Sequence, residues 1–373
     1  MKKKIFQILK IIFLFRFQIL PPRKKKYLLF DDNHKNYLLK YIKENDLEVL
    51  HIRKEKINLS IVIFNFLKFK FTFRDYLETY IDFTSPRFIV TFSDNSESFF
   101  ILKKRKNSKK VLIQNSWKNR HNDTFLNVDH SNFNCDYLFT FNKKIGDIYS
   151  KILKCEPIIV GSFKNNSNKI ITNNIKTYEI LFISSFRNFD PSKFITHGMT
   201  FKDYDLFQRQ AIKETSECIK QNKLKLYIYG SDPFNSDIEK NYYDQLSLNC
   251  NWEFIKNDRS KTYQIMDQSN LIIGTHSTAI YEAIGRGIKV FVFSRNYKEE
   301  KLNTQRFGWP YAFQDEGFFW VNNFSNKYLI NKKIETILNL SQIDWFKKIH
   351  DIREKLMFFD NGNKKFNNLL KVD

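Results

Sequence analysis

The sequence predicts an α/β protein made of two Rossmann-like, doubly wound domains that face a central cleft. The chain has 373 residues, of which 42% are hydrophobic, and this is enough to build two cores. Short apolar strands alternate with helical stretches, as in parallel sheets that carry helices on both faces. An Asn- and Ser-rich stretch at residues 161–175 interrupts the alternation, which then starts again. That stretch is the predicted interdomain linker.

The first half contains six predicted strands, and most of them run directly into polar residues. The first strand, residues 26–30, is followed by a helical pattern at residues 34–45. The other strands of this half are expected at residues 47–51, 88–92, 110–113, 136–141 and 157–160. Because the strands alternate with helices, they are expected to run parallel and to end at one edge of the sheet.

The second half repeats this order. Strands are expected at residues 179–183, 224–229, 252–255, 271–273 and 289–293, and helices at residues 207–221, 260–269 and 279–285. The chain is therefore predicted to consist of an amino-terminal segment (1–25), a first domain (26–165), a second domain (176–345) and a helical tail (346–373).

The amino-terminal segment combines an apolar run with basic clusters on both sides. It reads MKKKIFQILKIIFLFRFQILPPRKKK, and Gln7, Lys10, Arg16 and Gln18 interrupt the apolar run. A membrane-spanning helix needs about 20 mainly apolar residues, and a signal peptide needs small residues at its cleavage site. The pattern instead favours an amphipathic helix on an anionic membrane surface, and a helix packed on the protein itself is the alternative.

The chain is strongly basic. Its net charge of +22 comes from 62 Lys and Arg against 40 Asp and Glu, which attracts nucleic acid, anionic lipid or phosphorylated substrates. Lys is spread along the whole chain, so part of the excess can be compositional. A nucleic-acid-binding protein is the second hypothesis, but the sequence has no RNP motif, zinc-ligand spacing or helix-turn-helix pattern, and nucleic acid is not an expected partner. The four cysteines form no CxxC pair, which fits a reducing cytoplasm.

The clearest chemical signal is the segment LIIGTHSTAIYEAIGRGIKVFVFS at residues 271–294. It predicts a strand, a tight turn at Gly274, a helix and a second strand. Ser277 and Thr278 stand at the amino end of the helix, where backbone N–H groups and the helix dipole bind a phosphate. Glu282, one turn along, is expected to accept hydrogen bonds from ribose hydroxyls. An ordinary Ser or Thr helix cap is the alternative.

Further donor-binding residues are predicted at the carboxyl ends of the second-half strands, because ligands of open α/β sheets bind there. Arg187 is expected to bind a phosphate or a sugar carboxylate with two hydrogen bonds, and an exposed surface arginine is the alternative. His276 is predicted to be an acid, a base or a phosphate donor, and a structural loop histidine is the alternative. The remaining predicted donor residues are Ser184, Ser185, Asn188, Gly230, Ser231 and Thr275.

The same reasoning predicts an acceptor site in the first half, at Asn95, Gln114 and Asn115. Asp94 is predicted to be the catalytic carboxylate, as a base toward the acceptor hydroxyl or as a nucleophile. It follows an apolar strand, as Asp31 and Asp32 do. The alternative for Asp94 is a turn that caps a helix at residues 97–102.

These segments resemble a known family. STAIYEAIGRGIKVFVF resembles the donor-site segment of GT-B glycosyltransferases that assemble bacterial surface polysaccharides. TFSDN (91–95), IQNSW (113–117) and VGSFKNN (160–166) resemble segments of lipopolysaccharide or capsule transferases. The resemblance implies a nucleotide-sugar donor held by Ser277, Thr278 and Glu282, with Asp94 near the transfer centre and with no essential metal or cofactor.

The Ser277–Thr278 pair is also similar to the phosphate-binding motif of GT-B enzymes that use CMP-linked ulosonic acids such as Kdo or sialic acid. The His-Pro pair of such sialyltransferases is absent from this sequence, so a UDP- or GDP-sugar stays open. The expected acceptor is a cell-surface glycan or a lipid-linked precursor, reached by peripheral attachment at the cytoplasmic face of the inner membrane. A sugar-nucleotide epimerase of the same fold is a further alternative.

Overall fold

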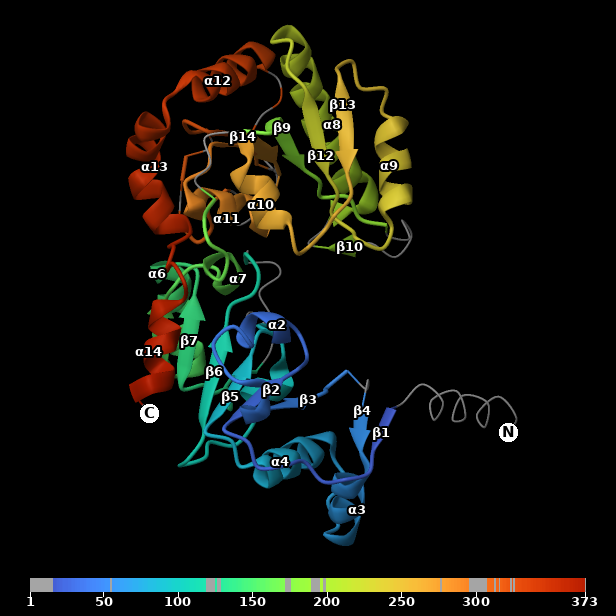
Figure 1. Cartoon of the computed structure of the whole chain (residues 1–373), viewed down its shortest axis with the longest axis vertical. Coiled ribbons are helices and arrows are strands. Elements are labelled where there is room, and N and C mark those ends of the chain that lie inside the picture. Colours follow the sequence, from blue (N-terminus) through green and yellow to red (C-terminus); the bar gives the residue numbers. More distant parts are fainter. Residues whose placement is uncertain are drawn as a thin grey trace, which may run out of the picture. The chain divides into compact units, whose positions relative to one another are not determined.

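A computed structural model describes residues 16–53, 56–118, 125, 129–171, 176–188, 195–196, 199–275, 277–294, 307–311, 313–314, 316–322, 324 and 326–372. The chain divides into two compact units (Figure 1). Unit 1 comprises Met1–Asn115, Asn127–Ser167 and Asn363–Asp373, and unit 2 comprises Ser116–Leu126 and Asn168–Gly362. The division differs from the predicted one because Ser116–Leu126 belongs to unit 2 and the carboxyl-terminal segment returns to unit 1.

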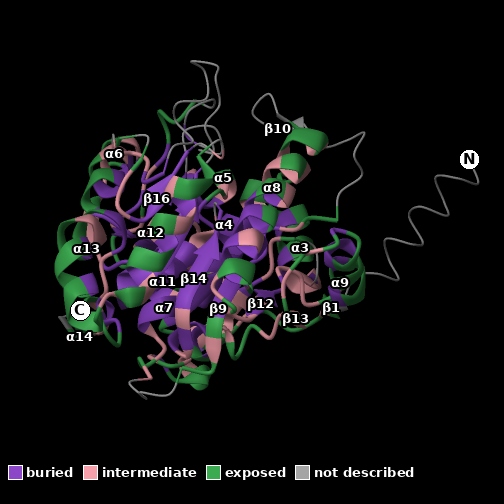
Figure 2. Ribbon diagram, turned by 90° about the horizontal axis from the view of Figure 1, so that it is seen from above, coloured by how far each residue is buried: buried purple, intermediate pink, exposed green. Residues whose placement is uncertain are grey.

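Unit 1 contains a parallel sheet of six strands in the order β3-β2-β5-β6-β7-β8. In the molecule as a whole, buried residues are concentrated in the sheets and the outer faces of the helices are exposed (Figure 2), but the edge strand β8 is only partly buried. The strand order reverses between β2 and β5, which is where such sheets bind ligands. The six predicted strands are confirmed to within one residue at each end: β2 (Tyr27–Phe30), β3 (Leu47–Leu50), β5 (Phe88–Thr91), β6 (Lys109–Ile113), β7 (Tyr137–Thr140) and β8 (Glu156–Ile159).

The helices of unit 1 differ more from prediction. The helix predicted at residues 34–45 is wrong in length, because α2 (Lys35–Leu38) is a single turn whose N-cap, His34, is left-handed and makes no capping bond. A 3-10 turn at Glu44–Asp46 then leads into β3. The other helices are α3 (Leu59–Leu67), α4 (Phe73–Thr84), α5 (Glu97–Phe100), α6 (Lys143–Leu153), α7 (Phe163–Asn166) and α14 (Lys364–Val372).

The amino-terminal segment is described only from residue 16 onward. The predicted membrane-surface helix therefore lies mostly outside the described residues, and its described part contains a strand instead. That strand, β1 (Arg16–Gln18), pairs in parallel with β4 (Lys56–Asn58), and Pro21 and Pro22 follow it. No helix within the described ranges is long and apolar enough to cross a membrane.

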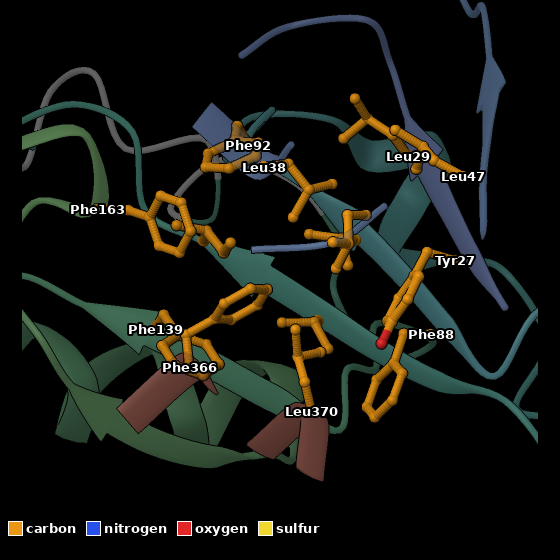
Figure 3. Packing of buried hydrophobic residues seen from close by; sticks show 14 of the residues in the cluster. Tyr27, Leu29, Leu38, Leu47, Phe88, Phe92, Phe139, Phe163, Phe366 and Leu370 are labelled. Carbon is orange, nitrogen blue, oxygen red and sulfur yellow. The ribbon is translucent and has the colours of Figure 1, made fainter. Parts of the chain in front are cut away.

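Phe366 and Leu370 of α14 complete one core of unit 1 (Figure 3). Phe366 packs edge-on against Phe139 and Phe163, with ring centroids 5.5 and 5.0 Å apart. Before α14, the Asn363 side-chain amide donates to Tyr41 Oη at 2.7 Å and to the Phe163 carbonyl at 2.9 Å. The predicted carboxyl-terminal tail is thus helical, but its last helix closes the first domain.

Unit 2 contains a second parallel sheet, in the Rossmann order β13-β12-β9-β14-β15-β16. The order reverses between β9 and β14. The five predicted strands are confirmed, and β16 is an addition: β9 (Tyr178–Ile183), β12 (Leu226–Tyr229), β13 (Trp252–Ile255), β14 (Ser269–Gly274), β15 (Val290–Phe293) and β16 (Trp320–Val321). A small hairpin pairs β10 (Ile195–Thr196) with β11 (Met199–Thr200).

Helices flank this second sheet. The three predicted helices are confirmed, although α8 begins six residues earlier than predicted, at a Thr200–Asp203 capping box. The helices of unit 2 are α8 (Phe201–Gln221), α9 (Ser236–Asp244), α10 (Thr262–Asp267), α11 (Thr278–Arg286), α12 (Lys327–Asn339) and α13 (Gln342–Leu356).

Candidate functional site

The candidate donor site of unit 2 lies at the switch point, where β9 and β14 are neighbours and the strand order reverses. Ser185 follows β9, and Thr275 follows β14. Their hydroxyl oxygens are 2.8 Å apart, and both residues are buried, at 6% and 2% exposure. Two residues predicted to share a site, although distant in the sequence, therefore meet where the strand-end argument placed them.

The first turn of α11 supplies two further hydroxyls beside this pair. Ser277 is the N-cap, and its Oγ accepts the backbone N–H of Ala279 at 3.3 Å. Thr278 Oγ1 accepts the backbone N–H of Trp117 at 3.0 Å. A hydroxyl that accepts one hydrogen bond still carries a proton to donate. The helix cap is therefore present, and it leaves both hydroxyls able to donate to a phosphate oxygen.

Trp117 is a part of this site that the sequence did not predict. Its ring stacks on the ring of Tyr281 in α11, with centroids 3.6 Å apart and an interplanar angle of 2°. The Tyr281 hydroxyl accepts the backbone N–H of Gly308 at 3.3 Å, and burial raises the pKa of this phenol. Trp117 thus holds the start of α11 through a backbone hydrogen bond and a ring stack. No spacing in the sequence signals a contact over such a distance along the chain.

Gly274, predicted to permit a tight turn, also stands where there is little room for a side chain. A Cβ atom at this position would lie 2.8 Å from Ile280 Cδ1 and 3.3 Å from the carbonyl oxygen of Ile183. A side chain here would require Ile280 to shift and would press against the carbonyl oxygen of Ile183. Glycine therefore lets α11 pack directly against the end of β14, which brings the first turn of the helix to the switch point.

Two charged residues of α11 are buried, and one of them is structural. Arg286 Nε donates to Asp267 Oδ1 at 2.7 Å, Nη2 contacts Oδ2, and the guanidinium also donates to the carbonyls of Asn168 and Lys169 at 3.1 Å. Arg286 therefore fixes the segment where unit 2 resumes. Glu282, the predicted ribose ligand, is 4% exposed, and its role stays a prediction.

Ser184 and Ser231 hold neighbouring loops together. Ser184 Oγ accepts the Tyr243 hydroxyl proton at 2.6 Å and the backbone N–H of Phe186 at 3.0 Å. Ser231 Oγ donates to the carbonyl of Phe186 at 2.7 Å. Both hydroxyls, predicted to bind the donor, thus hold the loop after β9 in place. Among the other predicted donor residues, Arg187 and Asn188 are exposed.

Glu239 of α9 is a second contributor that the sequence analysis missed. It is fully buried, and its carboxylate accepts the backbone N–H groups of Ser231, at 2.9 and 3.0 Å, and of Asp232, at 3.2 Å. It thereby shapes the loop that begins at Gly230, whose carbonyl accepts the Asn257 amide at 2.9 Å. The sequence did contain a signal for the burial of Glu239. It lies three residues before Tyr242 and four before Tyr243, and therefore on the same helix face as these two buried tyrosines.

Two aspartate carboxylates lie at the switch point of unit 1. Asp31, after β2, accepts hydrogen bonds from the Ser93 hydroxyl at 2.7 Å and the Asn33 amide at 3.0 Å, and it pairs with Arg53 at 2.7 Å. Asp94, after β5, is 8% exposed, and its Oδ2 accepts the backbone N–H of Asn115 at 3.0 Å. Helix α5 begins at an N-cap of its own, Ser96.

The three predicted acceptor residues lie in different environments. Gln114 is buried, and its Oε1 accepts the backbone N–H of Phe141 at 2.9 Å, so it joins the ends of β6 and β7. Asn115 is half-buried, and its Oδ1 has no hydrogen-bond partner within the described part of the chain. Asn95 is exposed. The structure therefore brings Asn115 next to Asp94 and assigns Gln114 to the sheet.

Three further predictions concern His276, the cysteines and a metal ion. His276 lies outside the described residues. All four cysteines carry free thiols. Among the residues with described positions, no group of three His, Cys, Asp or Glu side chains could hold a metal ion, and metal independence stays a prediction.

Comparisons with known proteins agree with this architecture. A family described as "putative O-antigen biosynthesis protein" matches residues 111–373, which include all of unit 2 and the later segments of unit 1. The wall teichoic acid polymerase TagF is similar in structure, with a TM-score of 0.55 and 12% identity over 94% of this chain and 90% of that chain. The UDP-GlcNAc 2-epimerase from Methanocaldococcus jannaschii has a TM-score of 0.52 and 11% identity over 92% and 99%.

At these identities the likeness to solved structures concerns the fold alone. No curated protein matches the sequence. The two parallel sheets, with their reversed strand orders, are the two Rossmann-like domains of the GT-B fold. With this fold and a family match over more than half of its length, the chain belongs to the O-antigen biosynthesis protein family.

Proposed function

We propose that the chain is a glycosyltransferase that moves a sugar from a nucleotide-activated donor to a cell-surface glycan or a lipid-linked acceptor. The observation that carries this proposal is the buried Ser185–Thr275 hydroxyl pair at the switch point. The GT-B fold and the family membership support it. The reaction would take place at the cytoplasmic face of the inner membrane, with the protein attached peripherally.

The donor phosphate would bind at the first turn of α11. The helix dipole favours negative charge there, and the hydroxyls of Ser277 and Thr278 each retain one proton to donate. In the Ser185–Thr275 pair, one hydroxyl donates its proton to the other oxygen. The second hydroxyl therefore still has a proton that it can donate to the phosphate. These groups would also stabilise the charge on the leaving phosphate, which removes the need for a metal ion.

The proposed donor is a CMP-linked ulosonic acid such as Kdo. Such a donor carries one phosphate, and the start of a single helix can hold one phosphate. A UDP- or GDP-sugar carries two phosphates and would need a second group of donors, for which the exposed Arg187 is the candidate. Glu282 would hold the ribose hydroxyls in either case.

Asp94 would act as the base in the transfer step. Its carboxylate would take the proton of the acceptor hydroxyl while the acceptor oxygen attacks the anomeric carbon and the nucleotide leaves with the bonding electrons. The N–H of Asn115 orients that carboxylate. Asn95 and Asn115 would contact the acceptor, and His276 would assist as an acid or a phosphate donor.

A nucleotide screen followed by a transfer assay tests this proposal. The melting temperature of the full chain is measured with CMP, UDP and GDP, because a ligand that binds only the folded state raises it. We expect one nucleotide to stabilise the protein, and the matching sugar nucleotide to donate to a glycan or lipid-linked acceptor. Stabilisation by none of the three would refute the donor site.

The alternative of a sugar-nucleotide epimerase makes a different prediction in the same assay. The M. jannaschii epimerase shares the fold, and an epimerase converts its substrate without an acceptor. Product analysis with and without acceptor therefore separates the two reactions. A changed nucleotide sugar in the absence of acceptor would favour the epimerase.

A further inference from the structure

Helix α3 and the loop to α4 carry a dense group of exposed apolar side chains. Phe69 is 84% exposed, Leu67 and Phe71 are each 69% exposed, and Phe66 is 67% exposed. Soluble surfaces rarely expose large contiguous apolar patches unless they bind something. We call this group the α3 surface, and it comprises Val62, Ile63, Phe64, Phe66, Leu67, Phe69, Phe71 and Phe73.

The packing of unit 1 explains only a small part of this apolar surface, such as the edge-on contact of Phe64 with Phe83 of α4, whose ring centroids are 5.2 Å apart. Helix α3 packs chiefly on α4 and β1, at some distance from the six-stranded sheet of its unit (Figure 1). Only Ile61 and Asn65 of α3 are buried. A helix that buries so little would be expected to be polar on its remaining faces, because exposed apolar residues contribute nothing to folding.

Phe69 is the residue of the α3 surface that folding explains least. Its φ of 52° is in the left-handed region, where a residue other than glycine is disfavoured by about 1–2 kcal/mol. Glycine or asparagine would fit this turn better than phenylalanine. Because Phe69 is also highly exposed, neither the local backbone nor the core accounts for an aromatic ring at this position.

Basic side chains outnumber acidic ones among these apolar residues, and the nearest carboxylate, Asp75, is hydrogen-bonded to Thr72 in the capping box of α4. Lys68, Lys70 and Arg74 alternate with the aromatic residues, and no Asp or Glu occurs from Asn58 to Arg74. Two copies of this surface would bring like charges together, which disfavours self-association. Aromatic rings mixed with lysine and arginine are instead typical of proteins that bind the headgroup region of an anionic bilayer.

The amino-terminal segment joins the protein at the same place. Strand β1 pairs with β4, which runs directly into α3. The side chains of Asn58 and Ser60 donate to the carbonyls of Leu20 and Ile19 respectively, so residues 19–20 lie beside the start of α3. The residues that precede β1 in the sequence contain Lys2, Lys3, Lys4 and Lys10 but no acidic residue.

We propose that the α3 surface is a membrane-binding site for an anionic lipid bilayer. The aromatic and aliphatic side chains would insert at the level of the headgroups, while Lys68 and Lys70 would extend to the lipid phosphates. Arg74 adds positive charge nearby, but its guanidinium donates to the Ile101 carbonyl at 2.8 Å and pairs with Glu78 at 3.9 Å. This site is distinct from the amphipathic segment that the sequence suggested. Vesicle binding requires no sugar transfer, so the proposal stands or falls separately from the proposed activity.

Vesicle flotation of the full chain tests the proposal. We expect binding to vesicles of phosphatidylcholine mixed with phosphatidylglycerol, and weak binding to phosphatidylcholine alone. The triple variant Phe66→Ser, Phe69→Ser, Phe71→Ser should lose at least roughly tenfold in vesicle affinity, because each ring contributes apolar area to insertion. Phe234→Ser is the matched control, because Phe234 is an 86% exposed phenylalanine of unit 2, and its vesicle affinity should equal that of the wild type.

Two double charge-reversal variants test the electrostatic contribution to vesicle binding. Lys68→Glu with Lys70→Glu should reduce affinity for the anionic vesicles by more than about tenfold, because each lysine near such a surface is worth about 1 kcal/mol. Lys220→Glu with Lys223→Glu changes the net charge equally, at exposed positions at the end of α8 and just beyond it, and should have little effect. Equal losses in both pairs would mean that only overall charge matters, and would refute the site.

Tryptophan fluorescence shows directly whether the side chain at position 69 enters the bilayer. All five tryptophans lie in unit 2, so Phe69→Trp introduces a reporter into unit 1. Its emission should shift to the blue with anionic vesicles, and brominated lipid should quench it. The proposal is overturned if deletion of residues 1–15 abolishes flotation while the triple Phe variant still floats. A dimer that the triple variant dissociates, without vesicle binding by the wild type, would also overturn it.

Discussion

Both units reverse their strand order at one point, but the residues that follow the strands there differ in chemistry. In unit 1 the carboxylates of Asp31 and Asp94 follow β2 and β5. In unit 2 the hydroxyls of Ser185 and Thr275 follow β9 and β14 and bond to each other. Carboxylates can accept a proton, whereas hydroxyls at the start of a helix can bind an anion. The two sheets are alike at these points, because both reverse their strand order there. The difference between a proton-accepting site and an anion-binding site therefore lies in the residues of the loops that follow the strands.

The strongest test of this division is Asp94→Asn. Asparagine retains the oxygen that accepts the N–H of Asn115 but cannot take up a proton, so we expect transfer to fall by about 100- to 10,000-fold. The stabilisation by the nucleotide should be unchanged, because the donor site belongs to unit 2. Initial rates of transfer and nucleotide-dependent melting measure the two effects.

Asp31→Asn is the matched control within the same switch point. Asp31 already accepts from Ser93 and Asn33 and pairs with Arg53, so its loss should mainly lower stability. We expect the rate per folded molecule to remain close to that of the wild type. The comparison would break if Asp31→Asn abolished transfer and Asp94→Asn did not, because the base would then be the other carboxylate.

Two buried charges, one in each unit, are held in different ways. Unit 2 pairs Arg286 with Asp267, whose side chains are 0% and 2% exposed. Arg286→Met leaves the Asp267 carboxylate buried without its partner, and we expect the free energy of unfolding to fall by about 3–5 kcal/mol. Urea unfolding followed by tryptophan fluorescence reports on unit 2, because all tryptophans lie there.

The double variant Arg286→Met, Asp267→Leu controls for the loss of one partner. Removing both charges should restore most of the stability, because no uncompensated ion remains. Nucleotide binding by the folded double variant should match that of the wild type. Loss of nucleotide binding there would mean that Arg286 contacts the donor phosphate, contrary to its position in the fold.

The second of these charges, Lys110 of unit 1, is buried against carbonyl oxygens. Lys110 is 1% exposed, and its Nζ donates to the carbonyls of Phe100 and Leu102 and to Asn134 Oδ1. Burial lowers the pKa of Lys110 to about 8. Between about pH 8 and the usual lysine pKa, the unfolded chain holds a proton that the folded chain lacks, so raising the pH favours the folded state.

Lys110→Met isolates this effect. The free energy of unfolding of the wild type minus that of the variant should rise by about 1.4 kcal/mol per pH unit, and by about 3 kcal/mol in total. Other titrating groups cancel in the difference. Urea unfolding followed by circular dichroism at several pH values measures it. A difference that does not change with pH would show that the folded protein keeps Lys110 charged.

The sequence could predict the parts of the site that depend on strand ends. Ile183 and Gly274 are register partners, so the residues just beyond them, including Ser185 and Thr275, were bound to lie close together. Hydrophobic patterns locate strands well, and parallel strands end at one edge. The fold and the Ser185–Thr275 pair follow from these two facts.

The contacts that hold the site in place could not be predicted in this way. Trp117 reaches Tyr281 through a tertiary contact, and Arg286 pairs with an aspartate on a neighbouring helix, so neither pairing has a local pattern. The α3 surface was missed for another reason. Its apolar run, from Ile61 to Phe73, shows no clear helical period and resembles a core segment, and only the structure shows that it is exposed.

The smallest expected effect tests whether Ser277 is more than a cap. Ser277 and Ser341 are both N-caps of helices in unit 2, and each accepts a backbone N–H in the first turn. Substitution of either by alanine should cost about 1 kcal/mol of stability. Ser277→Ala should in addition weaken nucleotide binding by roughly tenfold, which equals about 1.4 kcal/mol, because a donor to the phosphate is lost. Calorimetric titration of both variants measures this. If Ser277→Ala bound nucleotide as tightly as Ser341→Ala, Ser277 would be a cap only, and phosphate recognition would fall to Thr278 and the Ser185–Thr275 pair.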